Sequence, residues 1–347
     1  FIFGVKEGGI GLAKQIKNDK PMKFKLLGFI SDDIEIRHHH LMGSKVYAYD
    51  KNTVKIMRDK NISALLISPG AIIDFRKDKN FQDTLLANGI RIYMPTTQEW
   101  NGDHQQLREV SIEDLLPRDE ISIDMESVGA MLKSKRILIT GSAGSIGSEM
   151  VRQIAKYNPA ELILIDSAET PQHDIRLMMA KQFPDIKAET IVTTICSKSR
   201  MEHIFKTYLP DYVFHAAAYK HVPMMENNPC ESIQNNVYGT KILADLAVKY
   251  GVKKFVMIST DKAVNPTNVM GCSKRICEIY VQSLNKAIEE GIINGKTQFV
   301  TTRFGNVLGS NGSVIPLFKK QIKAGGPVTV TDPRIIRYFM LIPEACK

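Results

Sequence analysis

The sequence predicts an α/β protein in which two doubly wound parallel sheets follow one another along the chain. Short apolar runs alternate with helical stretches, and glycine-rich turns follow apolar runs near residues 4–9 and 141–147. The length of 347 residues is enough for two hydrophobic cores. The expected division is a first domain at 1–115, a connector at 116–134 with a turn at Pro117, and a second domain at 135–347.

The first domain opens with a strand, a glycine-rich turn and an amphipathic helix within residues 1–16. The apolar runs at 24–30, 64–68 and 90–94 are expected to be further strands. The turn departs from the Rossmann pattern G-x-G-x-x-G, because Lys6 occupies the second glycine position, where a backbone approaches a pyrophosphate. We therefore expect a Rossmann-like domain, structural or regulatory, that does not bind NAD. Lys6 could hold a different anion, such as a phosphate, at the helix N-terminus.

The second domain opens with an apolar strand, a turn with three spaced glycines and a helix, within residues 135–156. The next strand, at 161–166, ends in Asp166, and this context is typical of a dinucleotide site. A carboxylate at that strand end binds the adenosine ribose hydroxyls and repels a 2′-phosphate, so we expect NAD rather than NADP. The cofactor-binding residues predicted here are Gly141, Ser142, Gly144, Ser145, Ile146, Gly147, Asp166 and Ser167.

Three later apolar runs extend the same sheet. The run at 211–218 ends in Ala216, Ala217 and Ala218, small residues that let a cofactor lie against the backbone. The run at 253–260 leads into Asp261 and Lys262, and ligands of doubly wound sheets bind beyond the carboxyl ends of strands. Residues 297–316 supply one more strand and a Gly/Ser/Asn-rich loop whose polar groups suit a sugar or a phosphate.

Composition narrows the function classes. The formal net charge is +9, but Lys and Arg are dispersed rather than arranged in a stripe with aromatic residues, so no nucleic-acid partner is expected. The five Cys have no metal-ligand spacing, and the run Arg37-His38-His39-His40 lies in a polar link, so no metal site is expected. Apolar stretches are shorter than a membrane span, and reduced thiols favour a cytoplasmic compartment.

Several motifs of the second domain are similar to those of a known family. The chain resembles the extended short-chain dehydrogenase/reductases, and among them the large UDP-N-acetylglucosamine 4,6-dehydratases of bacterial polysaccharide biosynthesis. The matching stretches are "TGSAGSIGSE" (140–149), "HAAAYKHVPMMENNP" (215–229), "NNVYGT" (235–240), "STDKAVNPTNVMGCSK" (259–274), "RFGNVLGSNGSVIP" (303–316) and "RYFM" (337–340).

The resemblance implies NAD-dependent 4,6-dehydration of UDP-N-acetylglucosamine to a UDP-4-keto-6-deoxy sugar. It also implies an extended fold whose substrate-binding part is truncated in this chain. The parent protein is expected to be membrane-anchored at the cytoplasmic face of the inner membrane and to form a homo-oligomer, whereas this part is expected to be soluble.

The same resemblance assigns the catalytic residues. Met270 stands one helical turn before Lys274, where smaller relatives carry a catalytic Tyr, and a thioether has no proton to give. The large members of the family also have Met there. Lys262 is then expected to be the base at C5, Asp261 the acid for the departing hydroxyl, and Thr260 the partner of the C4 oxygen. Lys274 is expected to hold the nicotinamide ribose.

The resemblance also implies contacts around the ligands. Ile195 and Asn236 are expected near the cofactor, and the run 194–197 departs from the family's acidic pattern near adenine, which leaves the Ile195 backbone or Ser197 for that contact. Asp332-Pro333-Arg334 replaces the more usual His-Pro-Glu. The predicted substrate-binding residues are Lys220, His221, Arg303, Asn306 and Arg337.

Two other functions compete with dehydration. A UDP-sugar 4-epimerase shares the fold and the cofactor but needs no base at C5, so the Asp261–Lys262 pair argues against it. A non-catalytic NAD-binding regulator of polysaccharide assembly is favoured by Met270, and the retained Thr260-Asp261-Lys262 and Lys274 oppose it.

Overall fold

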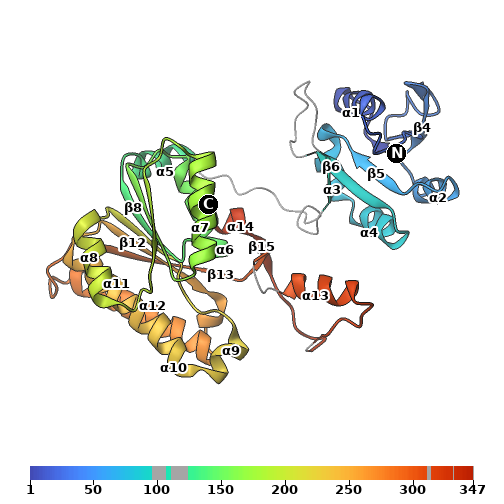
Figure 1. Cartoon of the computed structure of the whole chain (residues 1–347). Helices are drawn as coiled ribbons and strands as arrows, with labels where there is room; N and C mark the ends of the chain where they lie inside the picture. The colour runs from blue at the N-terminus through green and yellow to red at the C-terminus, as the bar shows by residue number, and fades with distance from the viewer. Residues whose placement is uncertain (96–106, 111–123, 311–313, 331, 347) are drawn as a thin grey trace. The chain divides into compact units, whose positions relative to one another are not determined.

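The computed structural model describes residues 1–95, 107–110, 124–310, 314–330 and 332–346, and the chain divides into two compact units (Figure 1). The units are Phe1–Asp119 and Glu120–Lys347. Within the predicted connector, helix α5 (Met125–Leu132) buries Leu132 in the core of the second unit, so that unit begins earlier than residue 135. The turn expected at Pro117 lies outside the described residues.

The first unit contains a seven-stranded sheet in the order β3-β4-β2-β1-β5-β6-β7. Its five central strands are parallel, and β3 and β7 pair antiparallel at the two edges. The strands are β1 (Ile2–Phe3), β2 (Phe29–Ser31), β3 (His40–Leu41), β4 (Ser44–Ala48), β5 (Ala64–Ile67), β6 (Arg91–Pro95) and β7 (Leu107–Glu109).

The strand expected at 24–30 is shorter than predicted. Its partner β1 begins at Ile2, opposite Phe29, so residues 24–28 have no ladder partner among the described residues. Phe24 and Leu26 still pack against the core, which explains why the apolar run resembled a longer strand. The strands expected at 64–68 and 90–94 form as β5 and β6.

Alternating residues of this sheet face two cores. Ile2, Phe29 and Leu66 pack against α1, whereas Phe3 and Ile30 pack against α3 and α4. The helices of this unit are α1 (Glu7–Asn18), α2 (Thr53–Asp59), α3 (Ile72–Lys77), α4 (Lys79–Ala87) and the short 3₁₀ turn η1 (Pro69–Ala71).

The second unit contains a six-stranded parallel sheet in the order β10-β9-β8-β11-β12-β13. This is the Rossmann order 3-2-1-4-5-6, and its direction of winding reverses between β8 and β11. The strands are β8 (Arg136–Thr140), β9 (Glu161–Asp166), β10 (Ala188–Val192), β11 (Tyr212–His215), β12 (Lys254–Thr260) and β13 (Gln298–Phe304).

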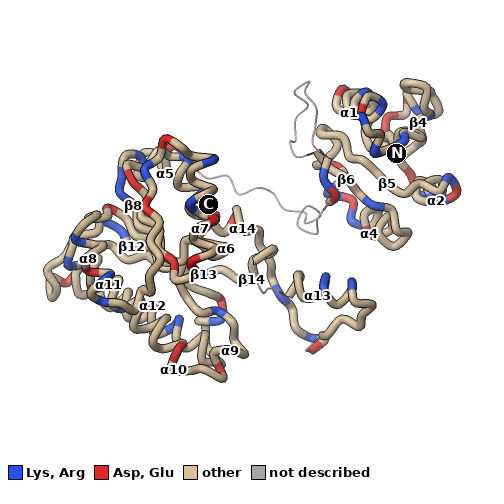
Figure 2. Tube along the Cα trace, viewed as in Figure 1, with Lys and Arg blue, Asp and Glu red and all other residues tan. Residues whose placement is uncertain are grey.

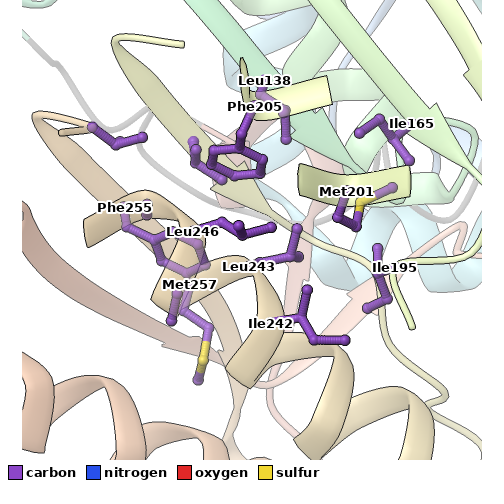
Figure 3. Packing of buried hydrophobic residues seen from close by; sticks show 14 of the residues in the cluster. Leu138, Ile165, Ile195, Met201, Phe205, Ile242, Leu243, Leu246, Phe255 and Met257 are labelled. Carbon is purple, nitrogen blue, oxygen red and sulfur yellow. The ribbon is translucent and has the colours of Figure 1, made fainter. Parts of the chain in front are cut away.

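Helices cover both faces of this sheet. Leu138, Ile163 and Ile165 face a core with α8, α11 and α12, which Figure 3 shows from close by, whereas Ile137 and Ile139 face α6 and α7. The helices are α6 (Ser145–Ala155), α7 (Glu169–Gln182), α8 (Lys198–Tyr208), α9 (Val222–Asn227), α10 (Pro229–Ser232), α11 (Gly239–Lys249) and α12 (Val269–Glu289), with a π-helical segment η3 (Ile233–Tyr238) and a 3₁₀ turn η4 (Asp261–Ala263).

The C-terminal residues add a two-stranded parallel ladder of β14 (Asn306–Leu308) and β15 (Phe339–Leu341), with helices α13 (Val314–Lys323) and α14 (Ile342–Cys346). The Gln153 side chain donates a hydrogen bond to the Pro343 carbonyl at 3.0 Å, which joins α14 to α6. Lys and Arg are interleaved with Asp and Glu over both units (Figure 2).

Candidate active site

The turn between β8 and α6 is tightly packed at positions that only glycine can occupy. Gly141 has a φ of +69°, and a Cβ there would lie 2.6 Å from the Ala217 nitrogen. A Cβ on Gly147 would lie 1.9 Å from the Gly141 carbonyl oxygen, so the helix meets the turn only through a glycine. Gly144 is the exposed N-cap of α6 and leaves the helix N-terminus without a side-chain cap. Such a terminus suits an anion.

Asp166 ties the tip of β9 to this turn. Its Oδ2 accepts the Ala143 N–H at 3.0 Å, and its Oδ1 accepts the Ala168 N–H at 2.9 Å. The carboxylate is half-buried at the edge of the sheet where a ribose is expected. Neighbouring Ser167 is exposed, and Ser145 and Ile146 form the first turn of α6.

Two residues predicted to contact the cofactor instead direct their side chains into the protein. Ser142 is fully buried, and its hydroxyl donates a hydrogen bond to the Gln172 Oε1 at 2.8 Å, which links the turn to helix α7. The Ile195 side chain is buried in the core and packs directly against Gly239, where a Cβ would clash with it. Only the backbone of these two residues can serve a cofactor.

Asn236 holds the loop that follows β11. Its Nδ2 donates to the Tyr219 carbonyl and the Ser273 hydroxyl, both at 3.0 Å. Its Oδ1 accepts the Tyr219 N–H at 2.8 Å and the Asn235 Nδ2 at 3.1 Å. All four hydrogen-bonding positions of this amide are therefore used within the protein, which makes Asn236 a positioning residue for the loop that begins with the alanines 216–218.

His215, to which the sequence prediction assigned no role, lies fully buried at the end of β11. Its Nδ1 is 2.7 Å from the Thr140 Oγ1, and its Nε2 is 2.8 Å from the Thr240 Oγ1. Because the Thr240 hydroxyl donates to the Asn236 carbonyl, it accepts from His215, and Nε2 carries the proton. Burial, together with the charge of Lys274, lowers the pKa of His215 to about 3, so the ring is neutral.

Thr260, Asp261 and Lys262 form one hydrogen-bonded group at the carboxyl end of β12. The Asp261 Oδ1 accepts the Thr260 hydroxyl at 2.9 Å and the Lys262 Nζ at 3.0 Å. Burial acts to raise the pKa of Asp261, but hydrogen bonds from Lys262 and Thr260 outweigh it and lower the pKa below the ordinary value. Asp261 is therefore ionised, whereas an acid role requires a proton on it.

Helix α12 fixes the position of this group. A Cβ on Gly271 would lie 2.3 Å from the Lys262 carbonyl oxygen, so the helix packs directly on the backbone of η4. Met270 and Lys274 occupy one helix, as the spacing predicted, and both are buried. Burial lowers the pKa of Lys274, and in the described part of the chain its ammonium has no hydrogen-bond or ion-pair partner. This buried amine, which has no partner in the described residues, suits a ligand hydroxyl.

Arg303 is committed to the protein rather than to a substrate. Its guanidinium forms a bidentate pair with Glu278, whose side chain is completely buried on α12. Glu278 also accepts the Ser259 hydroxyl at 2.6 Å and the Arg275 Nη1 at 3.0 Å. The bidentate face of this predicted substrate residue is thus occupied by a side chain of the protein. A charged residue one turn after Lys274 was the sequence signal that could have identified Glu278.

The other predicted substrate residues lie around the same edge of the sheet. Gly305 approaches Asp261, because a Cβ there would lie 3.6 Å from its Oδ2, and Asn306 follows it with a 3.2 Å bond to the Tyr338 carbonyl. Arg337, next to Tyr338, is exposed. Lys220 and His221 follow the alanine loop, and desolvation lowers the pKa of Lys220.

No group of three His, Cys, Asp or Glu residues in the described ranges could hold a metal ion. The described part of the chain likewise contains no helix of the length and apolarity that a membrane crossing requires.

The comparisons with known proteins cover both units of the chain. The model of a family described as "polysaccharide biosynthesis protein" matches residues 137–347. The capsular polysaccharide biosynthesis protein CapD of Staphylococcus aureus is 40% identical over 352 residues, which cover 100% of this chain and 58% of CapD. The chain therefore spans less than two thirds of the length of this relative.

Named enzymes match a smaller share of the chain. The inverting UDP-N-acetylglucosamine 4,6-dehydratase of Campylobacter jejuni is 36% identical over 62% of this chain and 63% of its own length. The UDP-glucose 4-epimerase of Rickettsia akari is 34% identical over 62% and 61%. The structure of DesIV, a dTDP-glucose 4,6-dehydratase of Streptomyces venezuelae solved with NAD, is 23% identical with a TM-score of 0.52, covering 61% of this chain and 69% of DesIV. That last likeness concerns the fold.

Proposed function

The chain belongs to the polysaccharide biosynthesis protein family, and from this membership we propose that it forms the catalytic part of an NAD-dependent UDP-N-acetylglucosamine 4,6-dehydratase. One observation carries the proposal. The hydrogen-bonded Thr260–Asp261–Lys262 group lies at the carboxyl end of β12, beside the buried Lys274, at the edge of a sheet wound for a dinucleotide. A base and an acid at that place serve elimination, whereas epimerisation at C4 needs no base at C5.

The residues of the second unit fit NAD. The N-terminus of α6 would hold the pyrophosphate, Asp166 the adenosine ribose, and the Lys274 ammonium the nicotinamide ribose. The glycines 141 and 147 support this assignment, because side chains at those positions would fill the turn. When bound, NAD supplies the hydride acceptor for C4 and the hydride donor for C6.

The proton transfers are assigned to this chain's own side chains. The ionised Asp261 takes the proton of the C4 hydroxyl, with Thr260 bonding the same oxygen. Protonating Asp261 also removes the charge that faces the Lys262 ammonium across 3.0 Å. Lys262 releases its ammonium proton to solvent and then takes the C5 proton, which the C4 ketone makes acidic, and Asp261 returns its proton to the C6 hydroxyl as water leaves. Lys262 finally reprotonates C5 and regains a proton from solvent, so Asp261 and Lys262 return to their starting charges and the net loss is one water.

The product identifies the reaction. A full-length protein that carries this chain should convert UDP-N-acetylglucosamine, in the presence of NAD, to a UDP-4-keto-6-deoxy sugar. Mass spectrometry detects this product by the loss of one water from the substrate mass. A galacto epimer of unchanged mass would identify the epimerase instead. Tight NAD binding with no product from any UDP-sugar would identify the regulator.

The second unit should prefer NAD to NADP, because the Asp166 carboxylate would face a 2′-phosphate with like charge. Asp166→Asn keeps an oxygen for the Ala143 N–H but removes the charge. We expect the ratio of NAD to NADP affinity to fall at least tenfold in this variant, about 1.4 kcal/mol, by isothermal titration. Equal affinities in the unmodified protein would contradict the assignment.

We also infer a homo-oligomer and a membrane-anchored parent. Four large apolar side chains of the adjoining segments η3 and α12, Ile233, Tyr238, Ile276 and Ile279, are each at least 44% exposed, which supports a protein-protein contact there. Sedimentation of the chain should give a mass above 39.0 kDa, and a monomer at all concentrations would refute the contact. Fractionation of cells that express the full-length protein tests anchoring at the cytoplasmic face of the inner membrane.

A further inference from the structure

The glycine turn of the first unit repeats the geometry of the turn in the second unit. Gly4 has a φ of +93°, and a Cβ on Gly9 would lie 2.1 Å from the Gly4 carbonyl oxygen, as one on Gly147 would lie 1.9 Å from Gly141. Lys6 precedes Gly9 by three residues and is the extended N-cap of α1, the place that Gly144 takes before Gly147. Both turns also lie where the winding of their sheet reverses, β1 beside β5 and β8 beside β11.

Two differences remove the features that suit a dinucleotide. Lys6 puts a long cationic side chain at the position that a glycine takes in the second unit. The second difference concerns the residue at the end of the second strand. Phe3 pairs with Ile30 in the first unit, as Thr140 pairs with Ile165 in the second. Ser31 therefore stands at the strand position of Asp166, and its buried hydroxyl accepts the Asp33 N–H. The strand position that holds a carboxylate in the second unit therefore holds a serine in the first.

What remains at the turn is a set of donors for one anionic group. The first two amides of α1, those of Glu7 and Gly8, have no acceptor among the described residues, and no side chain caps the helix. Lys6 is exposed beside them.

A second feature, independent of the helix, is the Ser68 side chain. Ser68, at the end of β5, is only 3% exposed, and within the described residues its hydroxyl makes no hydrogen bond. That oxygen lies against Gly4, 2.3 Å from the place of a Cβ there, so it points at the turn. With no acceptor among the described residues, this hydroxyl is free to donate a hydrogen bond to a ligand at the turn.

We propose that the Gly4–Gly9 turn binds the single phosphate group of a small phosphorylated molecule. The Glu7 and Gly8 amides, the Lys6 ammonium and the Ser68 hydroxyl supply the donors. A phosphate monoester is bound by several donors that converge on one phosphorus centre. Unlike a pyrophosphate, it does not require a glycine at position 6 for close approach of the backbone, which is where this turn differs from the NAD turn. The site belongs to the first unit and is independent of the dehydratase activity proposed for the second.

The test follows the amide signals of the two glycine turns in the isotope-labelled full chain. Inorganic phosphate is titrated at constant ionic strength, with sodium chloride as the reference. The signals of Gly8 and Gly9 should shift to saturation with phosphate, and NAD should shift Gly147 but leave Gly8 and Gly9 in place. Shifts that never saturate, or that chloride reproduces, would overturn the proposal, and so would NAD shifting both turns alike.

Variants of one helix separate the site from general electrostatics. Lys6→Met should weaken phosphate binding at least tenfold, whereas Lys14→Met, an exposed lysine farther along α1, should change it less than twofold. Ser68→Ala should also weaken binding, and Glu7→Gln should strengthen it by removing a like charge beside the phosphate. Equal effects of the two lysine variants, or no effect of Ser68→Ala, would overturn the donor set. Unchanged thermal midpoints serve as the folding control.

Discussion

Full-length protein in which methionine replaces Lys262 should oxidise its substrate at C4 and then stop. Methionine keeps the unbranched chain but has no base for the C5 proton, so elimination fails while hydride transfer to NAD remains possible. Turnover should fall by about 10²- to 10⁴-fold, the usual contribution of a general acid or base. Bound NADH should accumulate, which its fluorescence reports, and exchange of the C5 hydrogen with deuterated solvent should disappear.

Two other variants sharpen this expectation. Asp261→Asn removes the group assigned to the C4 and C6 oxygens, so its turnover should fall by a similar factor, and NADH should not accumulate because C4 oxidation itself loses its base. Met270→Leu keeps a buried apolar side chain on the same helix, and its turnover should fall less than tenfold, about 1.4 kcal/mol of barrier. If Met270→Leu abolished activity while Lys262→Met left C5 exchange intact, the base would have to be another residue.

Much of the second unit was predictable because its sequence patterns are local. The strand at 161–166 is bounded as the apolar run predicted, and Met270 and Lys274 share a helix because four residues make one turn. The glycine turn was equally accessible, since a strand, spaced glycines and a helix follow one another directly. The first unit was less predictable, because strand length depends on a partner distant in sequence, as residues 24–28 show.

Side-chain partners that the sequence did not reveal depend on tertiary pairing. The resemblance placed Arg303 among the substrate-binding residues, but Glu278, 25 residues earlier, forms a bidentate pair with its guanidinium. The Ser142 hydroxyl turns toward Gln172, 30 residues later. His215 had no predicted role because its two threonine partners come from different elements. Sequence reasoning places such residues near a site but does not determine which group each one faces.

The Glu278 carboxylate should be the most sensitive point of the second unit outside the site itself. It is completely buried and accepts hydrogen bonds from Ser259, Arg275 and Arg303, which joins β12, α12 and β13. Glu278→Gln preserves size but leaves two guanidinium groups without their counter-charge. Removing one partner of a buried ion pair costs about 3–5 kcal/mol, and because both arginines are more than a third exposed we expect about 2–3 kcal/mol.

Hydrogen exchange at the α12 amides measures this loss for the second unit alone, which matters because a chain of two units has no single free energy of unfolding. The matched control is Glu290→Gln, which breaks the exposed pair with Lys286 and should change protection by less than about 0.5 kcal/mol. Equal hydrogen-exchange protection of α12 in Glu278→Gln and Glu290→Gln would show that the buried ion pair contributes nothing to the stability of the second unit.

The pH dependence provides a second, independent check. Burial alone would raise the pKa of Glu278, but the hydrogen bonds from Arg303, Ser259 and Arg275 lower it from 4.5 to about 2. A carboxyl group whose pKa is lower in the folded than in the unfolded state stabilises the fold at every pH above its unfolded-state pKa. This contribution is lost as the pH falls from about 4.5 toward 2. Protection of α12 should therefore decline over this window in the unmodified protein and decline less in Glu278→Gln. Because Glu278 lies one turn after Lys274 and bonds the residue before Thr260, the same variant should also lower turnover, through displacement of both.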